Sequence, residues 1–333
     1  MASKGQKKIT FEEELALLSP AAADPTSADG RQRILAALAS QRSLVVARAA
    51  RLVKEHVLDG FAAPLRAAFE RYLPTAATAS ALQAATKLDP SCHAKLAAIE
   101  ALDHTESVDP EPFARAVRHF QPEGSGDTAA PLRSAGIAGL ARLGHRDFHM
   151  IVARLVSDRW PPVRQAALEA LAHRGDDAGA PLAMLKVELG DEDPQVDVAA
   201  MTTLLTLAPD WALEVLAALV DADGGRRELA AVALGQSRRD DALALLLDKL
   251  RVCPRADDRE AILRGLGLHR SEGALAAMLA IIREGKAAEA TLAIEALASR
   301  RFESGVGARV RGAAGENDAA DDLAAVVDQV FGG

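Results

Sequence analysis

The sequence predicts an all-helical protein made of stacked, antiparallel helix pairs, and three observations support this fold class. Hydrophobic residues make up 49% of the 333 residues but aromatic residues only 3%, so the core must consist mainly of Ala, Leu and Val; Ala and Leu are also strong helix formers. Clusters of β-branched and aromatic residues between turn signals, which would indicate strands, are scarce. From Pro131 onward, a pattern of two successive amphipathic helices recurs at a nearly constant period.

Charge and composition exclude several classes of protein. The formal net charge of −8 disfavours nucleic-acid binding, which needs a surplus of Lys and Arg, and it disfavours anionic membrane surfaces. Cys92 and Cys253 lie far apart in the sequence and fit a reducing compartment better than a disulfide framework. The N-terminus lacks the apolar core of a signal peptide, and no run of about 18 uncharged apolar residues occurs. We therefore expect a cytoplasmic protein without a membrane span; its oligomeric state stays open.

Residues 1–28 are expected to precede the main body. Residues 1–9 form a polar, basic tail, and a short helix follows, because Thr10 and Glu13 have the spacing of a capping box. The apolar face of this helix consists of Phe11, Leu15 and Leu18. The tract SPAAADPTSADG after it is expected to be a flexible linker. We expect the helix to dock on the body because its apolar face needs cover, with docking on a partner as the alternative.

The main body is predicted to be one helical-repeat domain spanning 29–302. Its earlier helices are expected at 29–39, 43–57, 61–73, 76–88, 92–103, 110–120 and 130–143, with Gly, Pro and Asp-Pro signals at the breaks. The Gly-rich segment from Gln121 to Pro131 is longer than the neighbouring connections. We interpret it as a loop insertion, and a protruding loop on a regular scaffold is a reasonable location for function.

The repeat is defined by a Leu near the end of the second helix of each pair. The aligned positions are Leu140, Leu171, Leu204, Leu234, Leu266 and Leu297. Subtracting successive positions gives spacings of 31, 33, 30, 32 and 31 residues, and the segment ending at Leu102 fits the same template. Because a single helix pair cannot bury its apolar face alone, neighbouring pairs are expected to stack around a shared core.

The segment Asp158–Asp177, DRWPPVRQAALEALAHRGDD, carries the clearest copy of the repeat. Its pattern consists of Asp158, Val163, Arg164, Ala166, Ala167, Ala170 and Leu171. This pattern resembles HEAT repeats, and most closely the short phycobilisome-lyase HEAT-like class, over about residues 92–300 and more loosely over 29–90. The resemblance implies a right-handed α-solenoid whose second helices form a concave, partner-facing side.

Arginines recur at two positions of the repeat. One aligned position in the second helices is occupied by Arg133, Arg164, Arg227 and Arg259, and by Asp197 in one copy. The resemblance to HEAT folds implies that such an Arg pairs with an acid of the adjacent repeat and forms a ladder. A second set follows the second helices and comprises Arg146, Arg174, Arg238, Arg270 and Arg300. We interpret the second set as surface cations near negative helix ends, with a binding row for an acidic partner as the alternative.

No catalytic or metal-binding constellation is evident in the sequence. His145 and His149 are four residues apart, but without an evident third ligand they are weak support for a metal site. HEAT-like di-iron hydroxylases use His-Glu dipeptides as ligands, and the chain contains none. We therefore predict no catalytic residue, no metal and no cofactor.

The repeat pattern fails after Arg301. In the C-terminal region, 303–333, the Gly-rich part of RFESGVGARVRGAAGEND is expected to be a linker or an irregular capping segment. A last helix is predicted at 318–331, with an apolar face of Leu323, Val326, Val327, Val330 and Phe331. We expect this helix to cover the open end of the repeat stack, with presentation of its apolar face to a partner as the alternative.

The predicted function is a non-enzymatic scaffold or adaptor that binds a protein or peptide on the concave face of the second helices. The candidate partner-binding residues are Gln165, Glu169, Glu228, Glu260, Arg264 and Glu295. The alternative is a HEAT-like lyase or accessory protein acting on a protein-bound cofactor. The two hypotheses differ in the expected site, because an enzyme needs a deep pocket where polar groups converge, whereas a scaffold needs a broad open groove.

Overall fold

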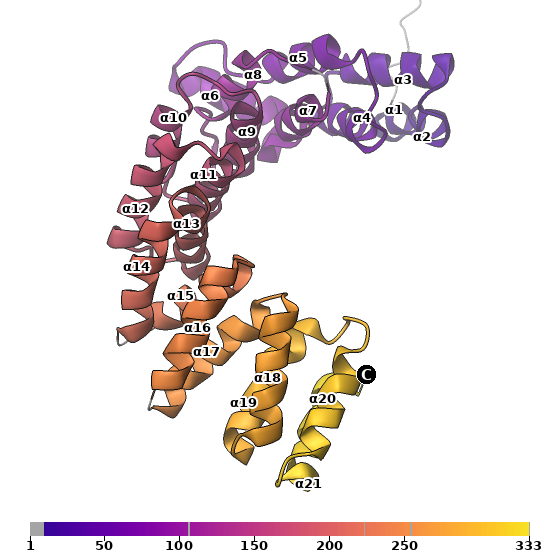
Figure 1. Ribbon diagram of the computed structural model, residues 1–333. Helices are drawn as coiled ribbons and strands as arrows, with labels where there is room; N and C mark the ends of the chain where they lie inside the picture. The colour runs from indigo at the N-terminus through magenta and orange to yellow at the C-terminus, as the bar shows by residue number, and fades with distance from the viewer. Residues whose placement is uncertain (1–9, 106, 223, 254, 333) are drawn as a thin grey trace, which may run out of the picture. The chain divides into compact units, whose positions relative to one another are not determined.

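The all-helical fold class is confirmed by a computed structural model that describes residues 10–105, 107–222, 224–253 and 255–332 (Figure 1). The predicted basic tail, residues 1–9, lies outside the described residues. The chain divides into two compact units, Met1–Arg174 and Gly175–Gly333. Within the described residues, no helix is both long enough and apolar enough to cross a membrane.

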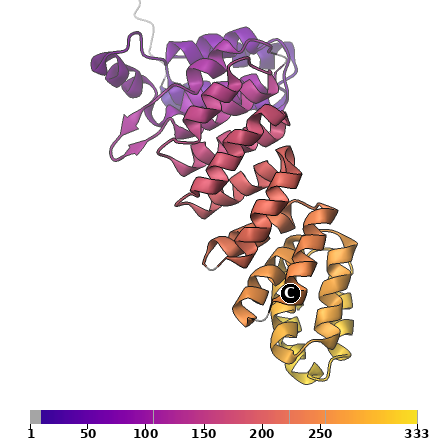
Figure 2. The same cartoon turned by 60° about the vertical axis from the view of Figure 1, so that its left-hand side comes forward.

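The first unit is a stack of helix pairs with one short hairpin. Its elements are α1 (Phe11–Ala16), α2 (Ser19–Ala23), α3 (Ala28–Leu38), α4 (Ser43–Glu55), α5 (Ala62–Arg71), α6 (Ala79–Leu88), η1 (Pro90–Cys92), α7 (His93–Asp103), α8 (Glu111–Ala116), β1 (Pro122–Glu123), β2 (Gly126–Asp127), α9 (Ala130–Arg142), α10 (Phe148–Leu155) and α11 (Pro161–Arg174). The pairs are α3 with α4, α5 with α7, α8 with α9 and α10 with α11, and successive second helices α4, α7, α9 and α11 pack on one another. Figure 2 shows the stacked helices and the two short strands.

The second unit continues the same alternation of first and second helices. Its elements are η2 (Asp177–Gly179), α12 (Ala180–Leu189), α13 (Pro194–Leu207), α14 (Pro209–Asp221), α15 (Arg226–Gln236), α16 (Asp240–Val252), α17 (Ala256–Leu268), α18 (Glu272–Glu284), α19 (Ala287–Ala296), η3 (Leu297–Arg300), α20 (Val306–Gly315) and α21 (Ala320–Phe331). The second helices α13, α15, α17, α19 and α21 pack in sequence, each beside its own first helix.

Burial of the aligned leucines confirms the predicted repeat register. Every one is at most 1% exposed: Leu102, Leu140, Leu171, Leu204, Leu234, Leu266 and Leu297. The first helices bury apolar residues at a spacing of four, as in α16, where Ala242, Leu246 and Leu250 face the core. This spacing places one stripe of each first helix against the second helices, as expected for an amphipathic helix.

Glycines allow the second helices α15, α17 and α19 to approach one another closely. A Cβ at Gly235 would lie 2.1 Å from the carbonyl oxygen of Gly265, and a Cβ at Gly265 would lie 2.4 Å from the carbonyl oxygen of Ala231. A Cβ at Gly267 would lie 2.3 Å from the carbonyl oxygen of Ala296. Glycine costs about 1 kcal/mol in a helix interior relative to Ala. At these positions that cost is offset by the close packing of neighbouring helix backbones.

Replacing Gly265 with Ala is therefore expected to lower the free energy of unfolding by about 1–3 kcal/mol, because the added methyl group must displace the backbone of α15. Urea denaturation followed by circular dichroism measures the change. Gly312→Ala on α20 is a matched control, since its Cβ would meet no atom within 4 Å, and it should be neutral or stabilising by up to about 1 kcal/mol. If the two variants were equally stable, the close approach of α15 and α17 would be wrong.

The predicted N-terminal helix is present and lies against the body, but the predicted linker after it is wrong. Thr10 and Glu13 form the expected capping box, with Thr10 N–H donating to Glu13 Oε2 over 2.7 Å. Of the predicted apolar face only Leu18, just after α1, is buried, at 2% exposed, and Glu14 of α1 lies 3.3 Å from Arg42 of the body. The tract that follows is folded: it contains α2, buries Ala21 completely and packs on α3. Pro and Ser suggested flexibility, but Pro is well tolerated in the first turn of a helix, and the small residues of α2 fit closely against α3.

The Gly-rich segment, expected to be a linker or an irregular capping segment, is a regular helix, so the expectation of a linker is wrong. It forms α20, which buries Val306, Val310, Ala313 and Ala314 and packs on α18 and α21. The last helix, α21, is present as predicted and packs on α19, so α20 and α21 form one more helix pair at the end of the stack. Asn317 joins this pair to α18, because its Nδ2 donates to the carbonyl oxygens of Ile282, Arg283 and Gly285 over 2.8, 3.1 and 2.9 Å.

Candidate functional site

Four of the six predicted partner-binding residues lie on adjacent second helices of the second unit. Glu228 is on α15, Glu260 and Arg264 are on α17, and Glu295 is on α19. The side chains of Glu228, Glu260 and Arg264 are 46%, 39% and 51% exposed, and Glu295 is exposed as well. We call these four residues the second-helix face.

Arg264 links two repeats on the second-helix face. Its Nη2 donates to Glu260 Oε1 over 2.6 Å, and its Nη1 donates to Glu228 Oε1 of the preceding repeat. The hydrogen bond to Glu228 and the charges of both glutamates raise the pKa of Arg264, while partial burial opposes the shift. Exposed ion pairs contribute only about 0–1 kcal/mol to stability, so their main effect is to hold these side chains in one arrangement. With three acids and one base, the face is negative.

The other two predicted residues, Gln165 and Glu169, lie on α11 of the first unit. Gln165 Nε2 donates to Glu169 Oε1 over 2.8 Å, one helical turn away. Glu169 is exposed and Gln165 is half-buried. They form a local pair on one helix, and the role of all six residues in binding stays a prediction.

The predicted arginine ladder is present within each unit. Arg133 donates from Nε and Nη2 to the two carboxylate oxygens of Asp158, over 3.0 and 3.1 Å. Arg227 pairs with Asp258 of the next repeat, and Arg259 pairs with Glu289, with Nε 3.1 Å from Oε1. Arg133, Arg227 and Arg259 therefore each contact an acid one repeat further along the chain. Arg164 Nη1 donates to the carbonyl oxygens of Asp158 and Arg159 over 2.9 and 3.2 Å.

Two ladder arginines also bind carbonyl groups at the ends of the preceding first helices. Arg227 Nε donates to Val220 O over 2.9 Å, and Arg259 Nη1 donates to Leu250 O over 2.7 Å. Arg133 Nη1 donates to His119 O, three residues beyond the end of α8, over 3.0 Å. The last carbonyls of a helix lack intrahelical partners and carry its negative dipole end. One arginine thus joins the end of a first helix to the next second helix, which explains its recurrence.

The ladder reverses its charges where Asp197 replaces the arginine. Asp197 is 2% exposed and accepts hydrogen bonds from Nε and Nη2 of Arg226 over 2.9 and 3.1 Å. Arg226 immediately precedes a ladder position, as Asp258 does in the following repeat. The same contact is therefore made with acid and base exchanged.

The second set of arginines does not form a single binding row. Arg300 is 3% exposed and shares Glu303 with Arg270, whereas the side chain of Arg146 is 90% exposed. Arg174 is half-buried: its guanidinium lies 4.8 Å from the centre of the Phe148 ring and donates to His145 O over 3.1 Å. Partial desolvation raises the pKa of Glu303, but the hydrogen bonds from Arg300 and Arg270 lower it by more. The net result is a lowered pKa. Arg238 is exposed. Arg174, Arg270 and Arg300 thus make different contacts, each with its own neighbours.

The segment from Gln121 to Pro131, which we interpreted as a protruding loop, is a hairpin that turns its polar side chains inward. Strands β1 and β2 pair antiparallel, and Glu123 Oε1 accepts from Gln121 Nε2, Thr128 Oγ1 and Ser91 N–H over 2.6, 2.7 and 2.8 Å. Ser91 and Cys92 both have left-handed backbone angles, with φ of 57° and 55°. Left-handed non-glycine residues are strained, and the Glu123 carboxylate stabilises this turn. The hairpin therefore has a structural role in joining η1 to α9.

A buried ion pair lies under this hairpin. Asp89 and Lys95 are both 0% exposed, with Lys95 Nζ 3.0 Å from Asp89 Oδ2, although no well-aligned hydrogen bond reaches Nζ within the described residues. The Asp89 carboxylate also accepts the N–H groups of Ala94 and Lys95 over 2.9 and 3.1 Å and so caps α7. Burial raises the pKa of the neighbouring Cys92 thiol to about 12, and both cysteines are free. No periodic pattern in the sequence indicated this pair.

Because His119 beside the hairpin is buried, we expect the protein to lose stability at acidic pH. His119 is 6% exposed, and burial together with the charge of Lys95 lowers its pKa to about 4 from an ordinary value of 6.5. Between pH 6.5 and 4, His119 binds a proton in the unfolded chain but stays neutral in the folded protein. Proton binding therefore favours the unfolded chain in this range, so the free energy of unfolding is highest above pH 6.5 and falls as the pH drops toward 4. We expect the free energy of unfolding to fall by about 2–3 kcal/mol more in the wild type than in His119→Gln between pH 7.5 and 4.5. Parallel pH profiles of equal slope would contradict this.

His145 and His149 are not part of a larger cluster of metal ligands in the described part of the chain. No group of three or more His, Cys, Asp or Glu residues is placed there to hold a metal ion. His145 Nδ1 accepts the N–H of Asp147 over 3.2 Å and so stabilises the turn before α10.

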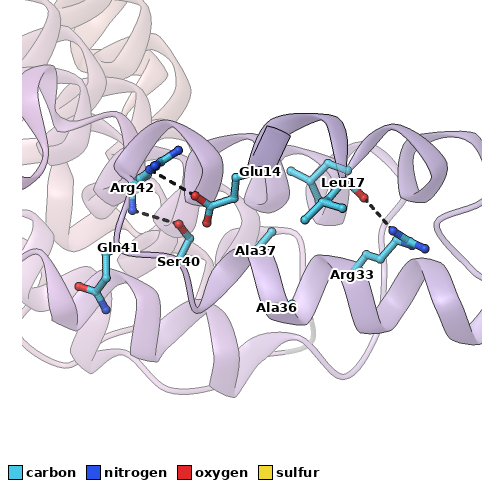
Figure 3. A pocket seen from close by; sticks show the side chains of 9 residues that line it. Glu14, Leu17, Arg33, Ala36, Ala37, Ser40, Gln41 and Arg42 are labelled. Atoms are coloured by element: carbon cyan, nitrogen blue, oxygen red, sulfur yellow. Dashed lines mark hydrogen bonds and ion pairs between the residues drawn. The ribbon is translucent and has the colours of Figure 1, made fainter. Parts of the chain in front are cut away.

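A pocket of about 450 Å³ lies between the N-terminal helix and α3 (Figure 3). Its wall includes Leu17, Leu18, Ala36 and Ala37. The charged side chains at its rim are engaged: Arg42 Nε lies 3.3 Å from Glu14 Oε2, and Arg33 Nε donates to Asp29 over 2.6 Å. The pocket can accept an apolar group, but its arginines are already neutralised.

Neither a protein-family model nor a curated protein matches the chain. Among solved structures, it is similar to a chain from the complex of CpcE and CpcF of phycocyanin lyase from Nostoc sp. PCC7120, with 16% identity and a TM-score of 0.35 over 99% of this chain and 98% of that one. An engineered protein is 14% identical, with a TM-score of 0.36 over 96% and 93% of the two chains. At these scores the likeness does not bear on function.

The repeat register and the arginine ladder are what define the architecture. The chain is an all-helical repeat protein of stacked antiparallel helix pairs. This fold class rests on contacts made within each unit.

Proposed function

We propose that this HEAT-like chain is a non-enzymatic scaffold that binds a protein or peptide partner on the second-helix face. The observation that supports it most is the linkage of Arg264 to Glu228 and Glu260, which joins exposed charges of two repeats into one ordered strip. Because α15, α17 and α19 are packed closely through glycine and alanine, the strip is carried by rigid elements. Preorganised groups lose little freedom on binding, which favours affinity.

The charge of the second-helix face indicates the chemistry of the partner. Glu295 makes no hydrogen bond or ion pair within the described residues, and Glu228 and Glu260 share a single arginine. A partner segment with basic side chains would complement this surface. Charges of this kind set the orientation and the rate of association more than the affinity, so the partner must also contribute apolar contacts.

The proposal is tested by affinity purification from native lysate with three versions of the chain, followed by mass spectrometry. The face variant carries Glu260→Arg and Glu295→Arg. The control carries two equivalent reversals on first helices of the same unit, Asp248→Arg on α16 and Glu284→Arg on α18, where both side chains are exposed. We expect the wild type and the control to retain the same protein and the face variant to lose it. Identical retention by all three would contradict the assigned surface.

A further inference from the structure

A second surface with different chemistry lies on the first helices of the first unit. A groove of about 210 Å³ runs between the end of α8 and α10. Its wall includes the buried side chains of Val117, Ile151 and Leu155, and Met150 stands beside it, 71% exposed. Arg118 and Arg154 also line it, and both are exposed. We call this the α8–α10 groove.

The two arginines of the α8–α10 groove differ from those at the other pockets. Neither guanidinium makes an ion pair or hydrogen bond within the described part of the chain. The arginines that line other pockets are all ion-paired there, namely Arg33, Arg42, Arg226, Arg283 and Arg309. The one acid of the groove, Asp147, lies 3.5 Å from Arg146, whose side chain is 90% exposed. The groove therefore presents, among the described residues, two arginines without an ion-pair partner over an apolar floor, and its single carboxylate, Asp147, lies beside a third arginine, Arg146.

The volume of the groove restricts its occupant. Pockets for drug-sized ligands hold roughly 300–1,000 Å³, and 210 Å³ is smaller. It fits a single apolar side chain, and an exposed Met adapts to varied apolar shapes. Guanidinium groups pair well with carboxylates, often through two parallel hydrogen bonds. A peptide with an apolar side chain flanked by carboxylates can therefore contact the apolar floor and pair with the two arginines at the same time.

We propose that the α8–α10 groove binds an acidic peptide segment of a protein partner. One apolar side chain of the peptide enters between α8 and α10, and acidic residues on either side of it pair with Arg118 and Arg154. This surface is chemically opposite to the second-helix face, which is negative. The proposal does not depend on the function of that face, because the two surfaces share no residue.

Fluorescence polarisation with the full chain tests the groove. The probe is a fluorescein-labelled peptide of sequence GEELEEG, compared with GKKLKKG, which reverses the charge, and with GEEGEEG, which lacks the apolar side chain. We expect the acidic leucine peptide to bind at least about tenfold more tightly than either alternative. Equal affinity for all three peptides would overturn the proposal.

Variants locate the binding on the chain. Arg118→Glu and Arg154→Glu should each weaken binding of GEELEEG several-fold, and the double variant at least about tenfold. Arg51→Glu is the matched control, because Arg51 on α4 is exposed and its guanidinium likewise has no partner within the described residues; it should change the affinity by less than about twofold. Met150→Ala, which alters no charge, should also weaken binding.

Two results would refute the assignment. An equal loss in Arg51→Glu and Arg118→Glu would show a general effect of net charge. Light scattering that finds a wild-type dimer and a monomeric Arg118→Glu, Arg154→Glu variant would show that a second copy of the chain, and not an acidic peptide, occupies the groove.

Discussion

Leu171→Ala is expected to lower the free energy of unfolding by about 2–5 kcal/mol. Leu171 is 1% exposed on α11 and occupies the aligned position at which every repeat buries a leucine. Its removal deletes apolar contacts and leaves a cavity that close-packed helices fill only in part. Urea denaturation followed by circular dichroism measures the loss.

Leu44→Ala provides the comparison for Leu171. Leu44 lies on α4 of the same unit but is 48% exposed, so its truncation should cost less than about 1 kcal/mol. A loss below about 0.5 kcal/mol for Leu171→Ala, or equal losses for both variants, would show that the repeat register is wrong.

Lys95→Met is expected to destabilise the first unit by about 3–5 kcal/mol, because it leaves the Asp89 carboxylate buried without its cation. The apolar stem of Met approximates that of Lys, so lost packing contributes little. The two N–H groups of α7 that bind Asp89 offset only part of the uncompensated charge. Thermal and urea denaturation of the full chain measure the effect.

A double variant separates charge from packing at this site. Asp89→Asn removes the negative charge but keeps an oxygen that can accept from the first turn of α7. In the Lys95→Met background it should therefore restore part of the lost stability, so the two changes together cost less than their sum. If the losses of the two single variants simply added up in the double variant, Asp89 and Lys95 would not be energetically coupled, despite their separation of 3.0 Å.

Periodicity in the sequence was sufficient to predict the repeats. The leucine spacing near the end of each second helix depends only on which residues must face the shared core, and burial of Leu140 through Leu297 confirms it. The resemblance to HEAT repeats likewise implied the ladder, and Arg133, Arg227 and Arg259 make its contacts. Both features occur in several copies of the repeat, so they can be distinguished in the sequence from a chance pattern.

Features that occur once were predicted poorly, for physical reasons. The composition of the segments around Pro20 and Gly312 suggested linkers, but tertiary contacts of Ala21 and Val310 outweighed local propensity. Glu123 and Lys95 are polar residues, and nothing in the sequence indicated that Glu123 accepts three hydrogen bonds within the hairpin or that Lys95 pairs with Asp89 in the interior. Arg118 and Arg154 are 36 positions apart by subtraction, and only the packing of α8 beside α10 brings them to one groove.

The candidate partner-binding residues were chosen as polar positions on the second helices, and their role stays a prediction. Glu228 and Glu260 lie six residues before the aligned leucine, and Arg264 and Glu295 lie two residues before it. The structure links Glu228 and Glu260 through Arg264. Their pairing depends on side-chain reach between α15 and α17, which spacing alone does not give.

Site-specific photo-crosslinking tests the central claim, that the second-helix face contacts the partner. A benzophenone amino acid is placed at Glu295 on α19 and, in a separate chain, at Asp248 on the first helix α16; both positions are exposed. After irradiation in native lysate, we expect one protein to crosslink from position 295 and not from position 248. Crosslinking of that protein from position 248 but not from 295 would contradict the proposed function.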